Sequence, residues 1–183
     1  NYVFSILYVH IINKETVSLM FSLKEKLLQD LTARANLSVR FRESLNIHSS
    51  FQDPCQRLLN AINVGSYIRP HRHCLDPKKE LLVAIKGKFA AIEFSDSGLF
   101  RGFSVFGSEK YCGSNESSYG VEVPVHCWHT VIALEAESVL LEVKEGPFDV
   151  HVAKELAPWA PLVGSIAVDD YVKSLYEYCR HGA

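Results

Sequence analysis

Short runs of alternating apolar and polar residues fill the middle of the chain, with turn-forming residues between them. Runs of this kind that are rich in Val, Ile, Phe and Tyr are typical of half-buried β-strands. Many short strands at even spacing predict an antiparallel sandwich or barrel, so the expected fold class is mainly β. The expected strands are residues 57–63, 66–73, 80–85, 88–94, 99–106, 119–123, 129–134 and 138–144.

Two segments with helical spacing of apolar residues flank these strands. Leucines recur at helical intervals after Ser22, and Ser22 with Glu25 forms a Ser-x-x-Glu capping box. A second helix is expected over residues 168–180, with acidic residues in its first turn. We expect both helices to pack on the outside of the barrel.

The first residues are apolar as well, and residues 2–12 predict a further strand. Met20 is the only methionine, so residues 1–19 are interpreted either as an extension outside the native reading frame or as an added strand. Such a strand would cover a sheet edge or pair with a second subunit, giving a homodimer. Residues 20–183 are expected to form a single domain.

Composition excludes several classes of protein. A net charge of −2 gives no general attraction to nucleic acid or to an anionic membrane. No segment approaches the ~20 apolar residues that a membrane span needs. The five cysteines are widely spread and contain no Cys-x-x-Cys pair, which favours reduced thiols in a cytoplasmic protein.

The candidate chemistry is concentrated between Gly65 and Gly87. His71 and His73 are two residues apart, so in an extended strand their imidazoles project to the same side. Glu80 follows a turn signal at Asp76-Pro77 and can return on a neighbouring strand to add a carboxylate.

A second stretch supplies a fourth candidate ligand. It spans residues 124–129 and contains Pro124, His126 and His129. His129 is expected to share a strand face with Val131, whereas His126 is expected in the turn before that strand.

These two stretches resemble the paired motifs of the cupin superfamily. The first is Gly, five residues, His-x-His, a gap, Glu, six residues and Gly, with a gap longer here than usual; the second is Pro-x-Gly-x-x-His. His126 stands where that second motif has glycine, a position that takes a left-handed turn and tolerates His mildly. The resemblance implies a double-stranded β-helix (jelly-roll) barrel and the metal ligands His71, His73, Glu80 and His129.

Further segments resemble the WbuC-type cupin-fold metalloproteins, which are often encoded among O-antigen genes. They are residues 53–61, 128–131, 142–147 and 159–161. This resemblance covers roughly residues 20–180 and implies a link to surface polysaccharide biosynthesis, but it implies no reaction, because that family has no settled activity.

Three imidazoles and one carboxylate suit a single divalent transition metal ion, with Fe, Mn, Co, Ni and Zn all compatible. Four protein ligands leave two positions open on a six-coordinate ion and none on tetrahedral zinc. Because each imidazole must ligate in its neutral form, metal binding should weaken below about pH 6.

Strand alternation suggests residues around the metal. If the strand has no bulge, Tyr67 and Arg69 share the face of His71. A buried arginine needs either an anionic group of the substrate or an internal salt bridge, for which Glu142 and Glu93 are the candidates.

The other proposed contacts come from three more segments. Arg57 and Asn60 have opposite parity, so at most one faces inward, and Trp128 forms either an aromatic wall or part of the core. Glu142 and Lys144 share a face that is either interior or solvated. The candidate catalytic groups are Tyr67 and Lys144, and the candidate substrate-binding residues are Arg69, Tyr67, Arg57, Trp128, Glu142 and Lys144.

Three functions fit these residues. The first is a metal-dependent enzyme acting on a small polar molecule, such as a sugar, a sugar nucleotide or an organic acid, by isomerase, epimerase or lyase chemistry; with Fe(II), a dioxygenase is an alternative. The second is a non-catalytic module that binds metal and carbohydrate. The third is a purely structural metal site.

Overall fold

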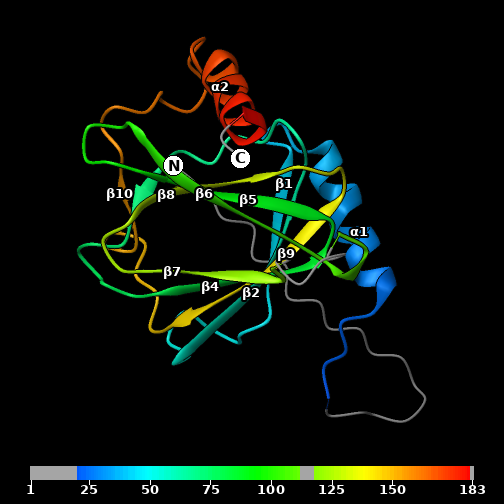
Figure 1. Cartoon of the computed structure of the whole chain (residues 1–183). Coiled ribbons are helices and arrows are strands. Elements are labelled where there is room, and N and C mark those ends of the chain that lie inside the picture. The colour runs from blue at the N-terminus through cyan, green and yellow to red at the C-terminus, as the bar shows by residue number, and fades with distance from the viewer. Residues whose placement is uncertain (1–19, 112–117, 182–183) are drawn as a thin grey trace.

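The computed structural model describes residues 20–111 and 118–181 of the chain. Two antiparallel sheets of five strands each face one another and form the body of the molecule (Figure 1). Sheet A has the order β1 (Arg42–Asn46), β2 (Cys55–Ile62), β9 (Ser138–Glu145), β4 (Glu80–Lys86), β7 (Gly120–Val123). Sheet B has the order β10 (Glu155–Leu156), β3 (His71–Arg72), β8 (Trp128–Ala133), β5 (Lys88–Phe94), β6 (Phe100–Gly107). A short 3₁₀ helix, η1 (Glu109–Tyr111), follows β6.

Alternation along the strands builds the core between the two sheets. On β8, for example, Val131 and Ala133 point inward, whereas Trp128 and Ile132 point outward. The inward set packs into one buried cluster with residues from the other strands: Ile62, Leu82, Ala84, Phe89, Ala91, Phe106, Val123 and Leu140. The predicted fold class, a mainly β double-sheeted barrel, is therefore confirmed.

Helix α1 (Glu25–Leu37) covers the outer face of sheet A (Figure 1). Its fully buried Leu31 and Ala35 contact Leu45 of β1 and Leu59 of β2. The predicted capping box is wrong: Lys24 is the N-cap residue, and no side chain caps the helix. The helix is held by its apolar face rather than by its cap, since most helical stability in proteins comes from tertiary packing.

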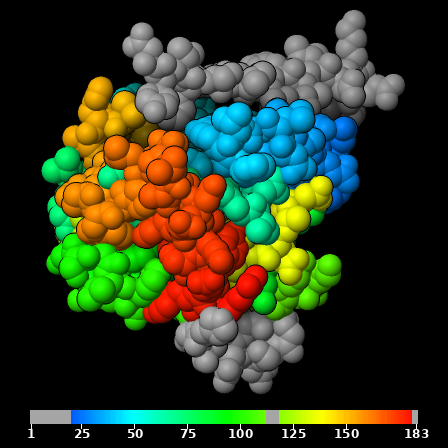
Figure 2. Space-filling model, turned by 90° about the horizontal axis from the view of Figure 1, so that it is seen from above, coloured from blue at the N-terminus to red at the C-terminus, as the bar shows by residue number. Residues whose placement is uncertain are grey.

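Helix α2 (Val168–His181) covers the outer face of sheet B. Leu175 is buried against Ile92 of β5 and Ile132 of β8, and the preceding stretch adds Ala157 and Ala160 to the same cluster. Figure 2 shows this C-terminal stretch in orange and red over one face of the molecule, with α1 in blue beside it. Both helices thus lie outside the barrel, as predicted.

The expected and observed strands differ in two places. Of the strand expected at residues 66–73, only His71–Arg72 is strand, because residues 66–70 run as irregular chain up to Pro70. The short strands β1 and β10 were not expected as strands of their own; β1 lies in a stretch interpreted as loop or short strand. The predicted strand at residues 2–12 lies outside the described residues.

Two further observations bear on composition. Neither α1 nor α2, the helices of the described chain, has the length and apolar content of a membrane span. Four cysteines are free thiols, and Cys112 lies outside the described residues: the free ones are Cys55, Cys74, Cys127 and Cys179.

Candidate metal centre

Four buried side chains converge between the two sheets. His71 and His73 come from β3 and the residue after it, and His129 comes from β8, where the strand register pairs it with His71. Glu80 is the first residue of β4, so it reaches the cluster from the opposite sheet. Their ligating atoms all lie within 4.8 Å of one another, and each residue is at most 4% exposed. The four predicted ligand residues are therefore brought together in two ways: strand pairing places the histidines side by side, and the opposite sheet contributes Glu80.

Backbone carbonyls fix the orientation of all three imidazoles. Nδ1 lies 3.1 Å from Arg69 O in His71, 2.6 Å from Ala153 O in His73 and 2.9 Å from Cys127 O in His129. A carbonyl only accepts, so each Nδ1 carries the proton and donates it. Each Nε2 is then a bare lone pair, which is the form that ligates a metal.

The Nε2 atoms face groups that cannot satisfy them. Nε2 of His73 is 3.0 Å from Oε1 of Glu80, and Nε2 of His129 is 3.5 Å from Oε2. The buried Nε2 of His71 has no hydrogen-bond partner among the described residues. A lone pair facing a carboxylate is repelled unless a proton or a cation lies between them.

A cation fits this arrangement better than extra protons do. Two donors at right angles around an ion with bonds of about 2.1 Å lie about 3.0 Å apart, and the separation of His73 from Glu80 is 3.0 Å. Extra protons would place several positive charges in a buried cluster, which is costly. The residues present therefore fit one divalent transition metal ion, held by three imidazoles and one carboxylate.

Electrostatics keep the ligands in the forms that bind a metal. Burial, assisted by the charges of Lys154 and His129, holds the pKa of His71 well below its usual value, so the ring is neutral at neutral pH. Burial acts to raise the pKa of Glu80, but a proton or cation shared with His129 and His73, together with the charge of Lys144, outweighs it. The pKa of Glu80 is therefore well below its ordinary value, and the carboxyl group is ionised.

A chain of polar contacts continues from Glu80 along the inner face of sheet A. Lys144 Nζ lies 2.8 Å from Glu80 Oε1 and 2.9 Å from Glu142 Oε1. Asn60 in turn donates to Glu142 across 2.9 Å, and Ser44 donates to Asn60 across 2.5 Å. Glu142 and Lys144 thus face the barrel interior. Of the two alternatives left open by the sequence, an interior face and a solvated face, the structure has the first.

Burial tends to lower the pKa of Lys144, but the charges of Glu142 and Glu80 raise it above the ordinary value. Lys144 is accordingly a cation at neutral pH. It can fix Glu80 and attract an anion, but it cannot act as a general base.

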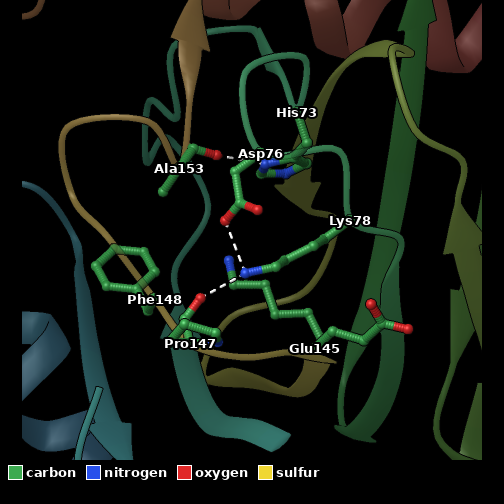
Figure 3. Close-up of a pocket in the computed structure, with 8 residues that line it drawn as sticks. His73, Asp76, Lys78, Glu145, Pro147, Phe148 and Ala153 are labelled. Atoms are coloured by element: carbon green, nitrogen blue, oxygen red, sulfur yellow. Dashed lines mark hydrogen bonds and ion pairs between the residues drawn. The ribbon is translucent and has the colours of Figure 1, made fainter. Parts of the chain in front are cut away.

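A small cavity of about 10 Å³ adjoins His73, room for about one water molecule. It is lined by the loop after His73 and by the segment after β9, which meet over the site (Figure 3). Lys78 joins these two segments, because its ammonium pairs with Asp76 at 2.7 Å and donates to the carbonyl of Pro147. Phe148 closes the same cavity, with Lys144 Nζ 5.6 Å from its ring centroid.

Tyr67 and Arg69 are not brought to the cluster by strand alternation. The prediction required a strand without irregularity, but residues 66–70 are not strand, and Ile68 packs against the core instead. Tyr67 donates to Pro161 O and lies edge-on to Tyr171 of α2. Arg69 donates to Ala157 O and, among the described residues, forms no ion pair with Glu142 or Glu93. The backbone carbonyl of Arg69, not its guanidinium, contacts His71, because it accepts the hydrogen bond from His71 Nδ1.

Two more predicted contacts lie on outer faces. Arg57 pairs with Asp53 at 2.9 Å and has the opposite parity to the inward-facing Asn60. Trp128 packs in the cluster beneath α2, donates to Asp96 and stacks under the Arg72 guanidinium. Core packing, one of the two roles considered for Trp128, is the one observed.

The turn of the second motif has the geometry that its glycine would give. His126 is exposed and has a φ of 64°, in the left-handed region. Its amide donates to His73 O across 3.2 Å, which ties the turn to the first motif. His126 is not part of the ligand group, whereas His129 is.

Sequence reasoning missed the carbonyls of Arg69, Ala153 and Cys127 because backbone groups leave no residue signature. It also missed the bridge from Lys78 to Pro147, which joins residues far apart in the chain.

Comparison with known proteins gives a family match over less than half of the chain. A family model described as "Domain of unknown function (DUF6016)" matches residues 23–103. No curated protein matches the chain in sequence.

Several solved structures are similar to the chain at low identity. KdgF from a Halomonas species shares 12% identity over 57% of this chain and 80% of its own, with a TM-score of 0.42. Protein SO0799 from Shewanella oneidensis shares 13% identity over 65% of this chain and 75% of its own, with a TM-score of 0.49. Rru_A2000 from Rhodospirillum rubrum is described as a cupin-2 domain. It shares 16% identity over 74% of this chain and 78% of its own, with a TM-score of 0.45. Likenesses at this level identify neither a substrate nor a reaction.

Proposed function

We propose that this chain is a metal-dependent cupin enzyme that acts on a small polar molecule, such as a sugar, a sugar nucleotide or an organic acid. One observation carries the metal assignment. Three buried imidazoles are locked by backbone carbonyls so that their bare Nε2 atoms converge on one carboxylate. No protein donor occupies the centre of that group, whereas a divalent cation would satisfy every member.

The four ligand residues and Lys144 have different roles at the site. His71, His73, Glu80 and His129 would hold the ion, and Lys144 keeps Glu80 ionised and oriented. A divalent ion at this place supplies Lewis acidity, which polarises a carbonyl or hydroxyl group of a substrate. Isomerase, epimerase and lyase reactions all use that chemistry.

The sequence-predicted catalytic groups have unequal support. Burial raises the pKa of Tyr67 to about 12, and its hydroxyl donates to Pro161 O, so it remains protonated and engaged. Lys144 lies inside the barrel and keeps its positive charge. Lys144 is therefore the stronger candidate, in an electrostatic role.

The resemblance to WbuC-type proteins supports a place in surface polysaccharide biosynthesis, which would make the substrate a sugar derivative. A non-catalytic metal- and carbohydrate-binding module is the second candidate. The small cavity beside His73 constrains both candidates equally, because a space for about one water molecule does not admit a sugar without movement of the Lys78 bridge.

Elemental analysis of the purified protein tests the metal assignment. We expect near-stoichiometric transition metal in the parent chain and its loss in His71→Ala and Glu80→Ala. His126→Ala is the matched control, because this histidine lies in the same motif but outside the ligand group. A parent chain without metal, or variants that retain it, would overturn the proposal. Turnover of candidate sugars by the loaded protein then separates the enzyme from the binding module.

A further inference from the structure

The barrel is open between two edge strands. In the sheet orders, β1 ends sheet A and β10 ends sheet B; they lie on the same side, because the other two end strands, β7 and β6, contact each other. On the opposite side the sheets approach each other, with a bridge between Phe106 and Ser118. The side of β1 and β10 has no such bridge among the described residues.

Inward-facing positions on both edge strands are exposed to solvent. On β1, Leu45 packs outward against α1, so Ser44 and Asn46 face inward, and both are exposed. On β10, Glu155 pairs with Arg72 on the outer face, so its neighbours Lys154 and Leu156 face inward. Leu156 is 50% exposed although it is opposite the buried His71 in the register. Solvent therefore reaches inward-facing positions on both edge strands.

Lys154 brings an uncommitted cation to the gap. Its residue is exposed, but burial of its ammonium lowers the pKa of Lys154, and the charges of Glu80, Lys144, Glu142 and Arg42 also act on it. Both carboxylates in this set are already paired with Lys144. Within the described chain, Lys154 forms neither an ion pair nor a hydrogen bond.

Arg42 brings a second cation from the facing strand. It is opposite Ile62 in the register and so faces inward like that core residue. Its Nη1 donates to Tyr67 O across 2.6 Å and to Ser66 Oγ across 3.3 Å. No carboxylate pairs with it among the residues described, and burial together with Arg40 lowers its pKa to about 10, which still leaves it charged.

The charges around the gap do not balance. Glu80 and Glu142 contribute two negative charges, whereas Lys144, Lys154 and Arg42 contribute three positive ones, and a divalent ion would add two more. Glu93, which the register places opposite His129, lies three strands away from β10 and is exposed. A half-enclosed excess of positive charge attracts an anion and holds it strongly, because low-dielectric walls weaken screening.

We propose that the gap between β1 and β10 is an anion subsite, in which Lys154 and Arg42 hold a carboxylate or phosphate group of a small molecule whose remaining atoms reach the ligand cluster. This inference deepens the proposed function, on which it rests for the role of the cluster, by making the substrate an anion. Arg42 offers its unused guanidinium N–H groups to two oxygens of such a group, and Lys154 adds a mobile point charge. A neutral sugar would leave both cations unpaired.

Calorimetric titration with three probes tests the subsite: inorganic phosphate, glucuronate and glucose. Each is titrated into the full chain as metal-loaded protein and after chelator treatment, with metal content measured on the same samples. We expect phosphate and glucuronate to bind, and glucose to bind at least tenfold more weakly. Lys154→Met should weaken anion binding about tenfold, whereas Lys154→Arg should retain it.

The variants are chosen so that folding does not confuse the result. Among the described residues, Lys154 makes no hydrogen bond or ion pair that its loss would break, whereas Arg42→Lys serves as the mild variant of a residue that also holds Tyr67 O. Lys79→Met is the matched control, since Lys79 is exposed and pairs with Glu122. Anion binding that is unchanged in Lys154→Met, or glucose binding as tight as that of the anions, would overturn the subsite.

Metal content separates the two proposals. Metal-loaded protein that binds no anion refutes the subsite and leaves the metal centre intact. Protein that takes up no metal under loading conditions but binds phosphate through Lys154 refutes the metal centre and supports the subsite.

Discussion

Lys144 donates a hydrogen bond to Glu80, with 2.8 Å between Nζ and Oε1. The same ammonium lies 2.9 Å from Glu142 Oε1, so one lysine separates two carboxylates on the inner face of sheet A. The side chains of Lys144, Glu80 and Glu142 are 8%, 4% and 12% exposed, which excludes water as their main partner. One buried positive charge therefore offsets only one of two negative charges, and a divalent ion at the cluster would turn the remaining deficit into a net positive charge.

Replacing Lys144 with Met should destabilise the metal-free protein by about 3 kcal/mol, because it leaves buried carboxylates without a partner. Adding a divalent ion should recover much of that loss, since the ion takes over the compensation of Glu80. Urea unfolding with and without chelator measures both effects. Lys79→Met removes an exposed pair and should change stability by less than about 1 kcal/mol. Equal metal dependence in the parent chain and in Lys144→Met would contradict this account.

His126 holds a left-handed backbone conformation in which a β-carbon is unfavourable. Its φ is 64°, and its side chain is exposed, so substitutions there report mainly on the backbone. We expect His126→Gly to stabilise the fold by about 0.5 kcal/mol and His126→Val to destabilise it by about 1–2 kcal/mol. Thermal unfolding measures the difference. Metal content should be the same in both variants, and a loss in either would show that His126 takes part in ligation.

The four ligand residues could be predicted from the sequence because they occur in two short motifs, and the spacing within each motif is local information. His71 and His73 are two residues apart, and the glycines on either side mark turns that the backbone needs, with φ values of 87° for Gly65 and 81° for Gly87. Alternation also predicted that His129 shares a face with Val131 and that Glu142 shares one with Lys144, but it left open whether the second face is interior.

The surroundings of the metal centre were predicted less well, because alternation fails where the strand is broken. Pro70 follows irregular chain, so Ile68 enters the core while Tyr67 and Arg69 turn toward the C-terminal segment. Lys154 was missed for a different reason. It directly precedes β10, which has two residues, too few for any period, and whose place depends on pairing with a strand more than eighty positions earlier.

Gly65 and Gly87 share a left-handed conformation but have different surroundings, so they separate backbone strain from crowding. A β-carbon at Gly65 would meet nothing within 4 Å, whereas one at Gly87 would lie 2.0 Å from Ser138 Oγ and 2.9 Å from Ser138 Cα. We expect Gly65→Ala to cost about 1 kcal/mol from backbone strain alone. Gly87→Ala should cost about 1–3 kcal/mol more, because Ser138 and its strand must move. Chemical denaturation of both variants tests this, and equal losses would show that crowding at Gly87 relaxes freely.

Tyr67 makes stability fall at alkaline pH. Burial raises its pKa to about 12 in the folded state, whereas an unfolded tyrosine titrates near about 10. Burial, with the nearby Tyr67, also raises the pKa of Tyr171. The contribution of these phenols is therefore complete below about pH 10 and is lost between about pH 10 and 12, as the unfolded chain releases protons that the folded chain retains.

Tyr67→Phe isolates this effect. The variant loses the hydrogen bond to Pro161 O, so at pH 8 its free energy of unfolding should fall by about 1 kcal/mol. From pH 10 upward its stability should decline less steeply than that of the parent chain, because one group with a raised pKa is gone. Tyr119→Phe is the control, since Tyr119 is 54% exposed and should leave the slope unchanged. Urea unfolding at pH 8, 9, 10 and 11 provides the slopes, and parallel curves for Tyr67→Phe and the parent would show that this phenol titrates no differently in the folded and unfolded chains.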